Sequence, residues 1–89
     1  MKYLNLYAPI WEDPRLNTTE KLIANYFWQW TVKNNYTWAS TQTIARTFGL
    51  DVEDVQDVVA KLLSGRWIKY LDCPEGTCIE FLLTKYEDL

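Results

Sequence analysis

Apolar residues recur with helical spacing in three segments of the chain. In the first segment they fall at i, i+1, i+4, i+5 and i+8, which places them on one face of a helix. These residues are Leu22, Ile23, Tyr26, Phe27 and Trp30. Asn17 and Glu20 form the pattern of a capping box at the start, and Leu16 is placed for a hydrophobic staple. We therefore expect a helix that begins after Asn17 and ends at residues 34–35.

Two shorter helices are predicted further along the chain. Ser40 offers a cap to a helix over residues 41–48, and Gly49 closes it because glycine readily adopts the left-handed conformation that follows a helix. Asp51 is expected to cap the next helix, which ends at residues 64–65. The apolar stripe of this last helix consists of Val52, Val55, Val58, Val59, Leu62 and Leu63.

The remaining segments have the character of strands. Residues 3–7 form a short extended apolar stretch, which is stopped by Pro9 and the loop that follows it. Residues 36–39 are expected to be a brief extended link between helices. Residues 67–71 and 79–83 alternate between apolar and polar, and the loop between them contains proline and glycine. The C-terminal part is therefore predicted to be a β-hairpin.

The length of 89 residues predicts a single domain over residues 1–89. The chain contains no histidine, which excludes Ser-His, Cys-His and His-metal sites. It also lacks a phosphate-cradling glycine-rich loop and a cluster of metal-ligating carboxylates. We therefore expect no enzyme, no catalytic residue, no metal site and no cofactor.

The chain has no long apolar segment, which affects the expected location of the protein and the expected redox state of its two cysteines. No run approaches the ~18 apolar residues that span a bilayer, and the first residues do not resemble a signal peptide. We expect a cytoplasmic protein with no membrane partner, in which Cys73 and Cys78 are reduced thiols. The two cysteines flank a four-residue turn, so a disulfide across the hairpin is the geometric alternative.

Two of the five tryptophans fall outside the predicted helix faces. Trp28 lies off the main stripe of the first helix, and Trp11 lies in a loop. We expect one or both to be exposed. Because exposed tryptophan is enriched at protein interfaces, this favours a protein partner or a homodimer.

The order of the predicted elements is strand, helix, helix, helix, hairpin. Since a very short turn joins the second and third helices, this is the layout of a winged helix-turn-helix, an α+β fold. The stretch over residues 14–71 resembles the winged helix-turn-helix domains of phage and plasmid replication proteins and related regulators. Those domains typically carry Trp-Pro-Ser, then a threonine and a Leu-Ala pair before a glycine. Here residues 38–40 read Trp-Ala-Ser and residues 43–45 read Thr-Ile-Ala before Gly49.

The resemblance implies a DNA-binding regulator or replication accessory. Its implied phosphate contacts lie on the second predicted helix and at its cap, and one implied base contact lies on the third helix. These residues are Ser40, Thr41, Gln42 and Arg46 for the phosphates and Gln56 for the base.

The third helix departs from the family pattern. The family commonly begins this helix with serine, two basic or polar residues, threonine and valine, whereas residues 51–55 read Asp-Val-Glu-Asp-Val. Asp57 stands where the family has an arginine, and Arg66 stands where it has a glycine before the wing. Glu53, Asp54 and Asp57 would therefore face the DNA groove.

Acidic residues dominate the second half of the chain. The net charge is −3, with +2 over residues 1–50 and −5 over residues 51–89. Besides the three acids of the third helix, Asp72, Glu75 and Glu80 lie on or beside the hairpin. Because DNA affinity comes mainly from lysine and arginine on phosphates, these carboxylates oppose duplex binding.

Two interpretations of this charge remain open. Carboxylates in the first turn of a helix are favoured by the helix dipole, which would account for Asp51, Glu53 and Asp54 structurally but not for Asp57. The acids of the hairpin would likewise be an ordinary solvated surface. Alternatively, all six acids form a surface for a protein partner, a nucleic-acid enzyme or regulator, and imitate phosphates. We lean to an adaptor or inhibitor that binds a protein, with the DNA-binding regulator as the alternative.

Overall fold

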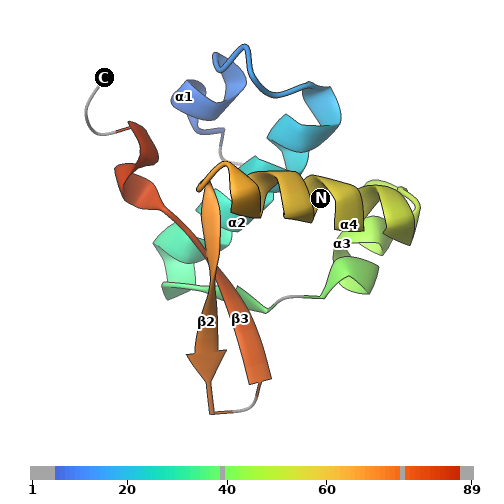
Figure 1. The fold of residues 1–89 in the computed structure, drawn as a ribbon, viewed down its shortest axis with the longest axis vertical. Helices are drawn as coiled ribbons and strands as arrows, with labels where there is room; N and C mark the ends of the chain where they lie inside the picture. The colour runs from blue at the N-terminus through green and yellow to red at the C-terminus, as the bar shows by residue number, and fades with distance from the viewer. Residues whose placement is uncertain (1–5, 39, 75, 87–89) are drawn as a thin grey trace.

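Helices and a small antiparallel sheet form an α+β fold in the computed structural model, which describes residues 6–38, 40–74 and 76–86. Figure 1 shows the β2–β3 hairpin extending away from the helices. In chain order the elements are α1 (Ala8–Trp11), α2 (Thr18–Asn34), β1 (Thr37–Trp38), α3 (Thr41–Phe48), α4 (Val52–Ser64), β2 (Ile68–Cys73), β3 (Gly76–Phe81) and the 3-10 helix η1 (Leu83–Tyr86).

The expected capping box at the start of α2 is confirmed. The Asn17 side chain accepts a hydrogen bond from the Glu20 backbone N–H at 2.9 Å, and the Glu20 carboxylate accepts one from the Asn17 N–H at 2.8 Å. Leu16, placed for the staple, is buried. Asn35 ends the helix in a left-handed conformation, with φ of 73°. Both ends of α2 therefore follow from local sequence.

Helices α3 and α4 also occupy the predicted segments. The Ser40 hydroxyl caps α3 by accepting a hydrogen bond from the Thr43 N–H at 3.2 Å, and Gly49 ends it with φ of 66°. Asp51 takes the N-cap position of α4, but its side chain makes no capping hydrogen bond there. The expected cap at Asp51 is therefore correct in position and wrong in mechanism.

The sheet is larger than the sequence indicates. Its strand order is β1-β3-β2, so the segment expected to be a link pairs as β1 with β3. Strand β2 runs on to Cys73 and β3 starts at Gly76, so the hairpin turn is shorter than the predicted loop. Leu83, expected in the second strand, instead begins η1.

The extended stretch expected over residues 3–7 falls mostly on residues 3–5, which lie outside the described part. The segment that follows, which contains Pro9, is the helix α1. Proline is accepted in a first helical turn because its missing N–H has no helical partner there. The buried Asn25 side chain holds α1 against α2 by accepting hydrogen bonds from the Tyr7 backbone N–H at 2.8 Å and the Trp11 indole N–H at 3.2 Å.

Trp11 and Trp28 are partly buried, contrary to the expected exposure of one or both. Trp11 bonds to Asn25, and the Trp28 ring stacks on Tyr7 with centroids 4.7 Å apart. Trp11 and Trp28, which lie outside the predicted helix faces, thus attach the N-terminal segment to α2.

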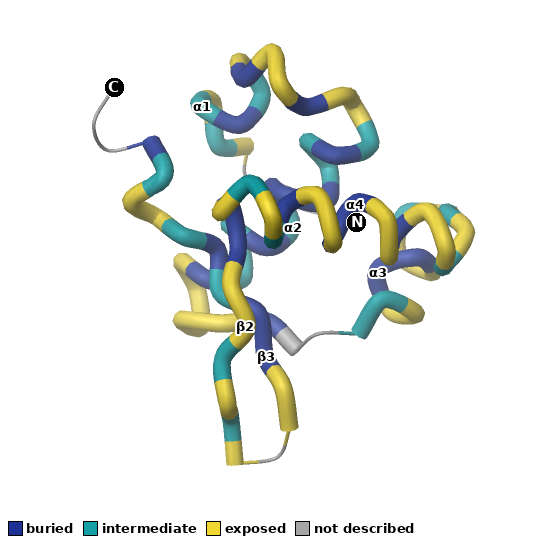
Figure 2. The backbone as a smooth tube through the Cα atoms, viewed as in Figure 1, coloured by how far each residue is buried: buried dark blue, intermediate teal, exposed yellow. Residues whose placement is uncertain are grey.

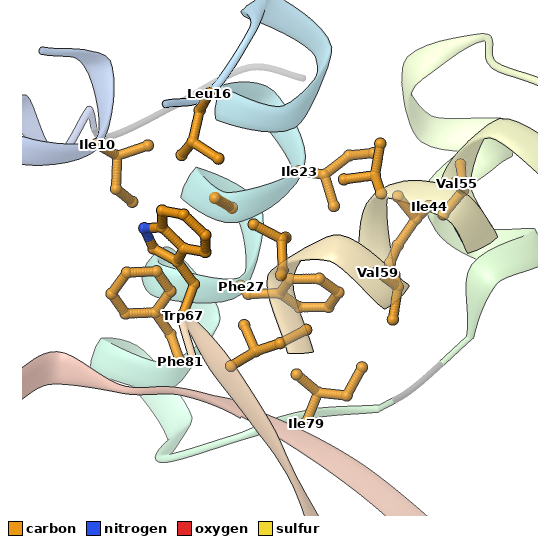
Figure 3. Packing of buried hydrophobic residues seen from close by; sticks show 14 of the residues in the cluster. Ile10, Leu16, Ile23, Phe27, Ile44, Val55, Val59, Trp67, Ile79 and Phe81 are labelled. Atoms are coloured by element: carbon orange, nitrogen blue, oxygen red, sulfur yellow. The ribbon is translucent and has the colours of Figure 1, made fainter. Parts of the chain in front are cut away.

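The core lies between α2, α4 and the sheet. Figure 3 shows its side chains pointing inward from these elements, from α3 and from the N-terminal segment, and Figure 2 shows dark buried positions along the helices and strands. Its fully buried members of largest volume are Phe27, Phe81, Ile10, Ile23, Ile44, Leu62, Ile68 and Ile79.

A hydrogen-bonded chain of buried groups connects the N-terminal loop to η1. The Trp67 indole N–H donates to the Tyr86 hydroxyl at 2.8 Å, and that hydroxyl donates to Asp13 at 2.9 Å. Arg15 completes the network with a bidentate pair to Asp13, at 2.9 and 2.7 Å. Hydrogen bonds from Arg15 hold the pKa of Asp13 well below its usual range, despite its burial. Side chains from three separate parts of the chain are thereby fixed together.

Cys73 and Cys78 form a disulfide, which corrects the expectation of reduced thiols. They are not directly opposite: Cys78 pairs with Leu71 across the sheet, and Cys73 pairs with Gly76. The bond runs diagonally across the hairpin end between Cα atoms 6.2 Å apart. The longer strands bring both cysteines to one face of the hairpin, because their register places them two positions apart.

Candidate functional site

The acidic face of α4 consists of Glu53, Asp54 and Asp57, and all three side chains are exposed. The opposite side of this helix carries the buried valines and Leu62, which pack into the core. Figure 2 shows exposed positions along the outer side of α4. The helix thus presents these acids to solvent, as the sequence predicts.

Lys61 is the only basic residue of α4, and it forms its ion pair with Glu20 of α2 and not with these acids. Its ammonium group donates to the Glu20 carboxylate at 2.8 Å and to the Arg15 carbonyl oxygen at 3.0 Å. Burial would raise the pKa of Glu20, but the bonds from Lys61 and the Asn17 N–H outweigh it and lower that pKa. Within residues 6–38, 40–74 and 76–86, no ion pair involves the three acids of α4.

The three acids do not have identical surroundings. Asp54 and Asp57 line a shallow depression of about 330 Å³ between α4 and the start of α2, together with Glu20 and Lys61. Glu53 does not line this depression. Glu53 and Asp54 lie in the first turn of α4, where the helix dipole favours them, whereas Asp57 lies beyond it. The helix dipole therefore leaves Asp57 unexplained.

The acids of the hairpin do not extend this face uniformly. Asp72 is exposed near the hairpin end, whereas Glu80 is half-buried opposite Lys69, with the Lys69 Nζ 3.9 Å from its carboxylate. The position of Glu75 lies outside the described residues. Of the hairpin acids predicted for the partner surface, Asp72 is the described one without an ion pair.

The residues implied for DNA contact lie on two elements. Gln42 and Arg46 are exposed on α3, Thr41 is partly exposed beside them, and Gln56 is exposed on α4. The Ser40 hydroxyl caps α3 and donates to the Thr43 hydroxyl at 2.9 Å, so it already has a structural role. Arg46 makes no ion pair within the described part of the chain.

An aromatic groove was not predicted from the sequence. It is an open hollow of about 580 Å³ between the C-terminal half of α2, β1 and the start of α3. Its lining residues are Tyr26, Trp30, Asn34, Tyr36, Thr37, Ser40 and Thr43. Tyr26 and Trp30 were assigned to the core face of the helix. The signal in the sequence was their spacing with Asn34 at i, i+4 and i+8, a second stripe beside the core stripe of Ile23 and Phe27.

Comparison with protein-family models, with curated proteins and with solved structures finds no match. Among the described residues, no helix combines the length and the apolar character that crossing a membrane requires.

Proposed function

We propose that this chain is a small winged-helix protein that binds a protein partner through the acidic face of α4, where Glu53, Asp54 and Asp57 take the place of nucleic-acid phosphates. The partner would be an enzyme or regulator with a basic nucleic-acid site. The resemblance to phage and plasmid replication domains is consistent with a phage or mobile-element protein.

The order of elements supports the winged-helix assignment. Helix α2 is followed by a short strand, two helices joined by three residues, and a hairpin whose second strand lies in the middle of the sheet. In helix-turn-helix proteins the second helix of the closely joined pair is the one that enters the major groove. In this chain that helix is α4, which carries the acidic face.

The observation that carries the proposal is the direction of Lys61. It is turned to Glu20 at 2.8 Å, so the outer side of α4 keeps its negative charge without a compensating cation from the same helix. A helix of this charge would repel DNA before any base could be contacted. The same charge attracts a basic protein surface, and complementary charge accelerates association.

DNA binding is the second candidate, and the exposed polar residues of α3 favour it. Gln42 and Arg46 are accessible, and Gln56 is the one exposed amide on α4. Glutamine is a typical reader of adenine, and arginine of phosphate or guanine. In this alternative the two helices contact DNA with their amides and Arg46, and the acids remain at the edge.

Binding to random duplex DNA over a salt series separates the two candidates. Tight binding with a steep loss of affinity as salt rises would overturn the protein-partner proposal. We expect no binding at low salt. In parallel, the immobilised chain should capture a nucleic-acid-binding protein from a bacterial lysate, and added duplex DNA should displace that protein.

Charge variants then test the face itself. The triple variant E53Q/D54N/D57N should lose the captured protein, because it keeps side-chain size and removes three charges. The matched control is Glu12→Gln, which removes an exposed acid outside α4 and outside the predicted partner surface and should retain capture. Equal capture by both variants would show that the acidic face of α4 is not the interface.

A further inference from the structure

The aromatic groove is uncharged, although the chain as a whole is acidic. Its walls are aromatic rings, hydroxyls and one amide, and none of its seven lining residues carries charge. Beside the groove, the ammonium group of Lys33 lies 5.4 Å from the centre of the Trp30 ring. A strand of phosphates would find no line of cations here, and most nucleic-acid affinity depends on such cations.

Packing holds the aromatic rings of the groove in place. The Tyr26 ring contacts the Phe48 ring edge-on, with centroids 5.8 Å apart. The Trp30 ring also lies beside the Tyr26 ring, with centroids 6.3 Å apart. Phe48 packs against the hydrophobic core. The groove is thus largely pre-formed, which lowers the entropic cost of binding a ligand.

The groove also offers unused hydrogen-bond donors. The indole N–H groups of Trp11 and Trp67 donate to Asn25 and Tyr86. By contrast, no hydrogen bond within the described residues is made by the indole of Trp30 or the hydroxyl of Tyr26. The indole N–H is a donor only, so its natural partner is a carbonyl oxygen. Burial raises the pKa of Tyr26, so its hydroxyl keeps its proton at neutral pH.

We propose that the aromatic groove binds an extended proline-rich peptide in the polyproline II conformation, from a second protein. Such a peptide has no internal hydrogen bonds, and its carbonyl groups are free to accept from Trp30 and Tyr26. Proline rings pack on aromatic side chains, which is how aromatic-lined grooves recognise proline-rich segments. An acidic residue beside the prolines would pair with Lys33. This site is separate from the acidic face of α4 and does not depend on the function proposed for it.

Titration of the full-length chain with a synthetic decaproline peptide, followed by amide chemical shifts, tests the proposal. We expect shifts confined to the residues around Trp30, Tyr36 and Thr43, and tighter binding when the peptide carries a terminal glutamate. A glycine-serine peptide of equal length is the ligand control. Absence of shifts at millimolar peptide, or equal binding of the glycine-serine peptide, would overturn the proposal.

Two variants test the donor at Trp30. Trp30→Phe keeps an aromatic ring and removes the indole N–H, and should weaken binding about tenfold, the value of one hydrogen bond of about 1.4 kcal/mol. Trp28→Phe is the matched control because Trp28 does not line the groove, and it should bind as the natural chain does. Thermal unfolding of each variant establishes that it folds. Equal binding by both variants would show that the Trp30 indole N–H does not contact the peptide.

A single-stranded oligothymidine is the competing probe. If it shifts the same residues at lower concentration than decaproline, the groove stacks bases and the peptide proposal is wrong. The variant E53Q/D54N/D57N should bind decaproline unchanged. Failure of the groove proposal therefore leaves the role of α4 untouched, and the reverse also holds.

Discussion

Lys61 on α4 and Glu20 on α2 form an ion pair at 2.8 Å, although 41 residues separate them in sequence. The same Glu20 oxygen accepts the Asn17 N–H that belongs to the capping box. The Glu20 carboxylate therefore takes part in the capping box of α2 and also pairs with Lys61, the only basic residue of α4. This relationship explains why the acidic face of α4 keeps its charge.

Lys61→Met should lower the free energy of unfolding by about 1 kcal/mol, because Glu20 would lose its partner while the aliphatic part of the side chain remains. Urea unfolding measures this change. Lys69→Met is the control, since Lys69 is exposed and lies 3.9 Å from Glu80. It should change stability by less than about 0.5 kcal/mol. A larger effect for Lys69 than for Lys61 would contradict the assigned roles.

Acid should weaken the fold through Asp13. Because the folded-state pKa of Asp13 is depressed, its contribution is fully present above the unfolded pKa of about 3.9 and is lost as pH falls below it. Unfolding free energies measured between about pH 2 and about pH 6, a range that spans the unfolded-state pKa, test this prediction. Asp13→Asn should be less stable near neutral pH by roughly 2–3 kcal/mol and should show a flatter acid limb. If Asp13→Asn loses stability in acid as steeply as the natural chain does, Asp13 is not the group responsible for that loss.

Alkali should weaken the fold through Tyr86. Burial raises the pKa of Tyr86 to about 12, and its hydrogen bond to Asp13 requires the phenolic proton. Its contribution is present below the unfolded pKa of about 10 and is lost as pH rises toward the folded value. The difference in unfolding free energy between the natural chain and Tyr86→Phe should shrink over that range. Every other titratable group is the same in both proteins, so the difference isolates Tyr86. A constant difference would contradict the prediction.

Gly65 and Arg66, two of the three residues between α4 and β2, should respond in opposite ways to substitution. A Cβ added at Gly65 would overlap the Trp67 ring, so Gly65→Ala should cost roughly 2 kcal/mol or more. Arg66 has φ of 64°, in the left-handed region that asparagine tolerates better than arginine. Arg66→Asn should therefore stabilise the fold by a few tenths of a kcal/mol to about 1 kcal/mol. Thermal unfolding of both variants gives the signs.

Reduction of the disulfide should lower stability by about 2 kcal/mol, the chain-entropy value for closing a loop as short as that between Cys73 and Cys78. Urea unfolding with and without dithiothreitol measures this loss. The double variant C73S/C78A should have the stability of the reduced chain and should not respond to dithiothreitol. A response of that variant would point to an effect unrelated to the bond.

The glycine position of the family pattern shows how far local sequence can be read. Arg66 stands where the resembled family has a glycine, and the backbone there is left-handed, as a glycine position indicates. Arg66 adopts this backbone although glycine is the residue that suits it best. By contrast, Asp51 has the right chemistry and the right position for a cap, and its side chain makes no capping bond. Residue type alone did not distinguish these two cases.

The sequence by itself determined the three longer helices, α2, α3 and α4, and the charge of α4, because capping, periodicity and residue type depend on neighbours within about four positions. Only the tertiary structure decided which way Lys61 turns, that Cys73 and Cys78 meet, and that Tyr26 and Trp30 line an open groove. Each of these depends on groups brought together from distant parts of the chain. The position of such groups depends on how α2, α4 and the sheet pack, and the pattern within any one segment does not contain that information.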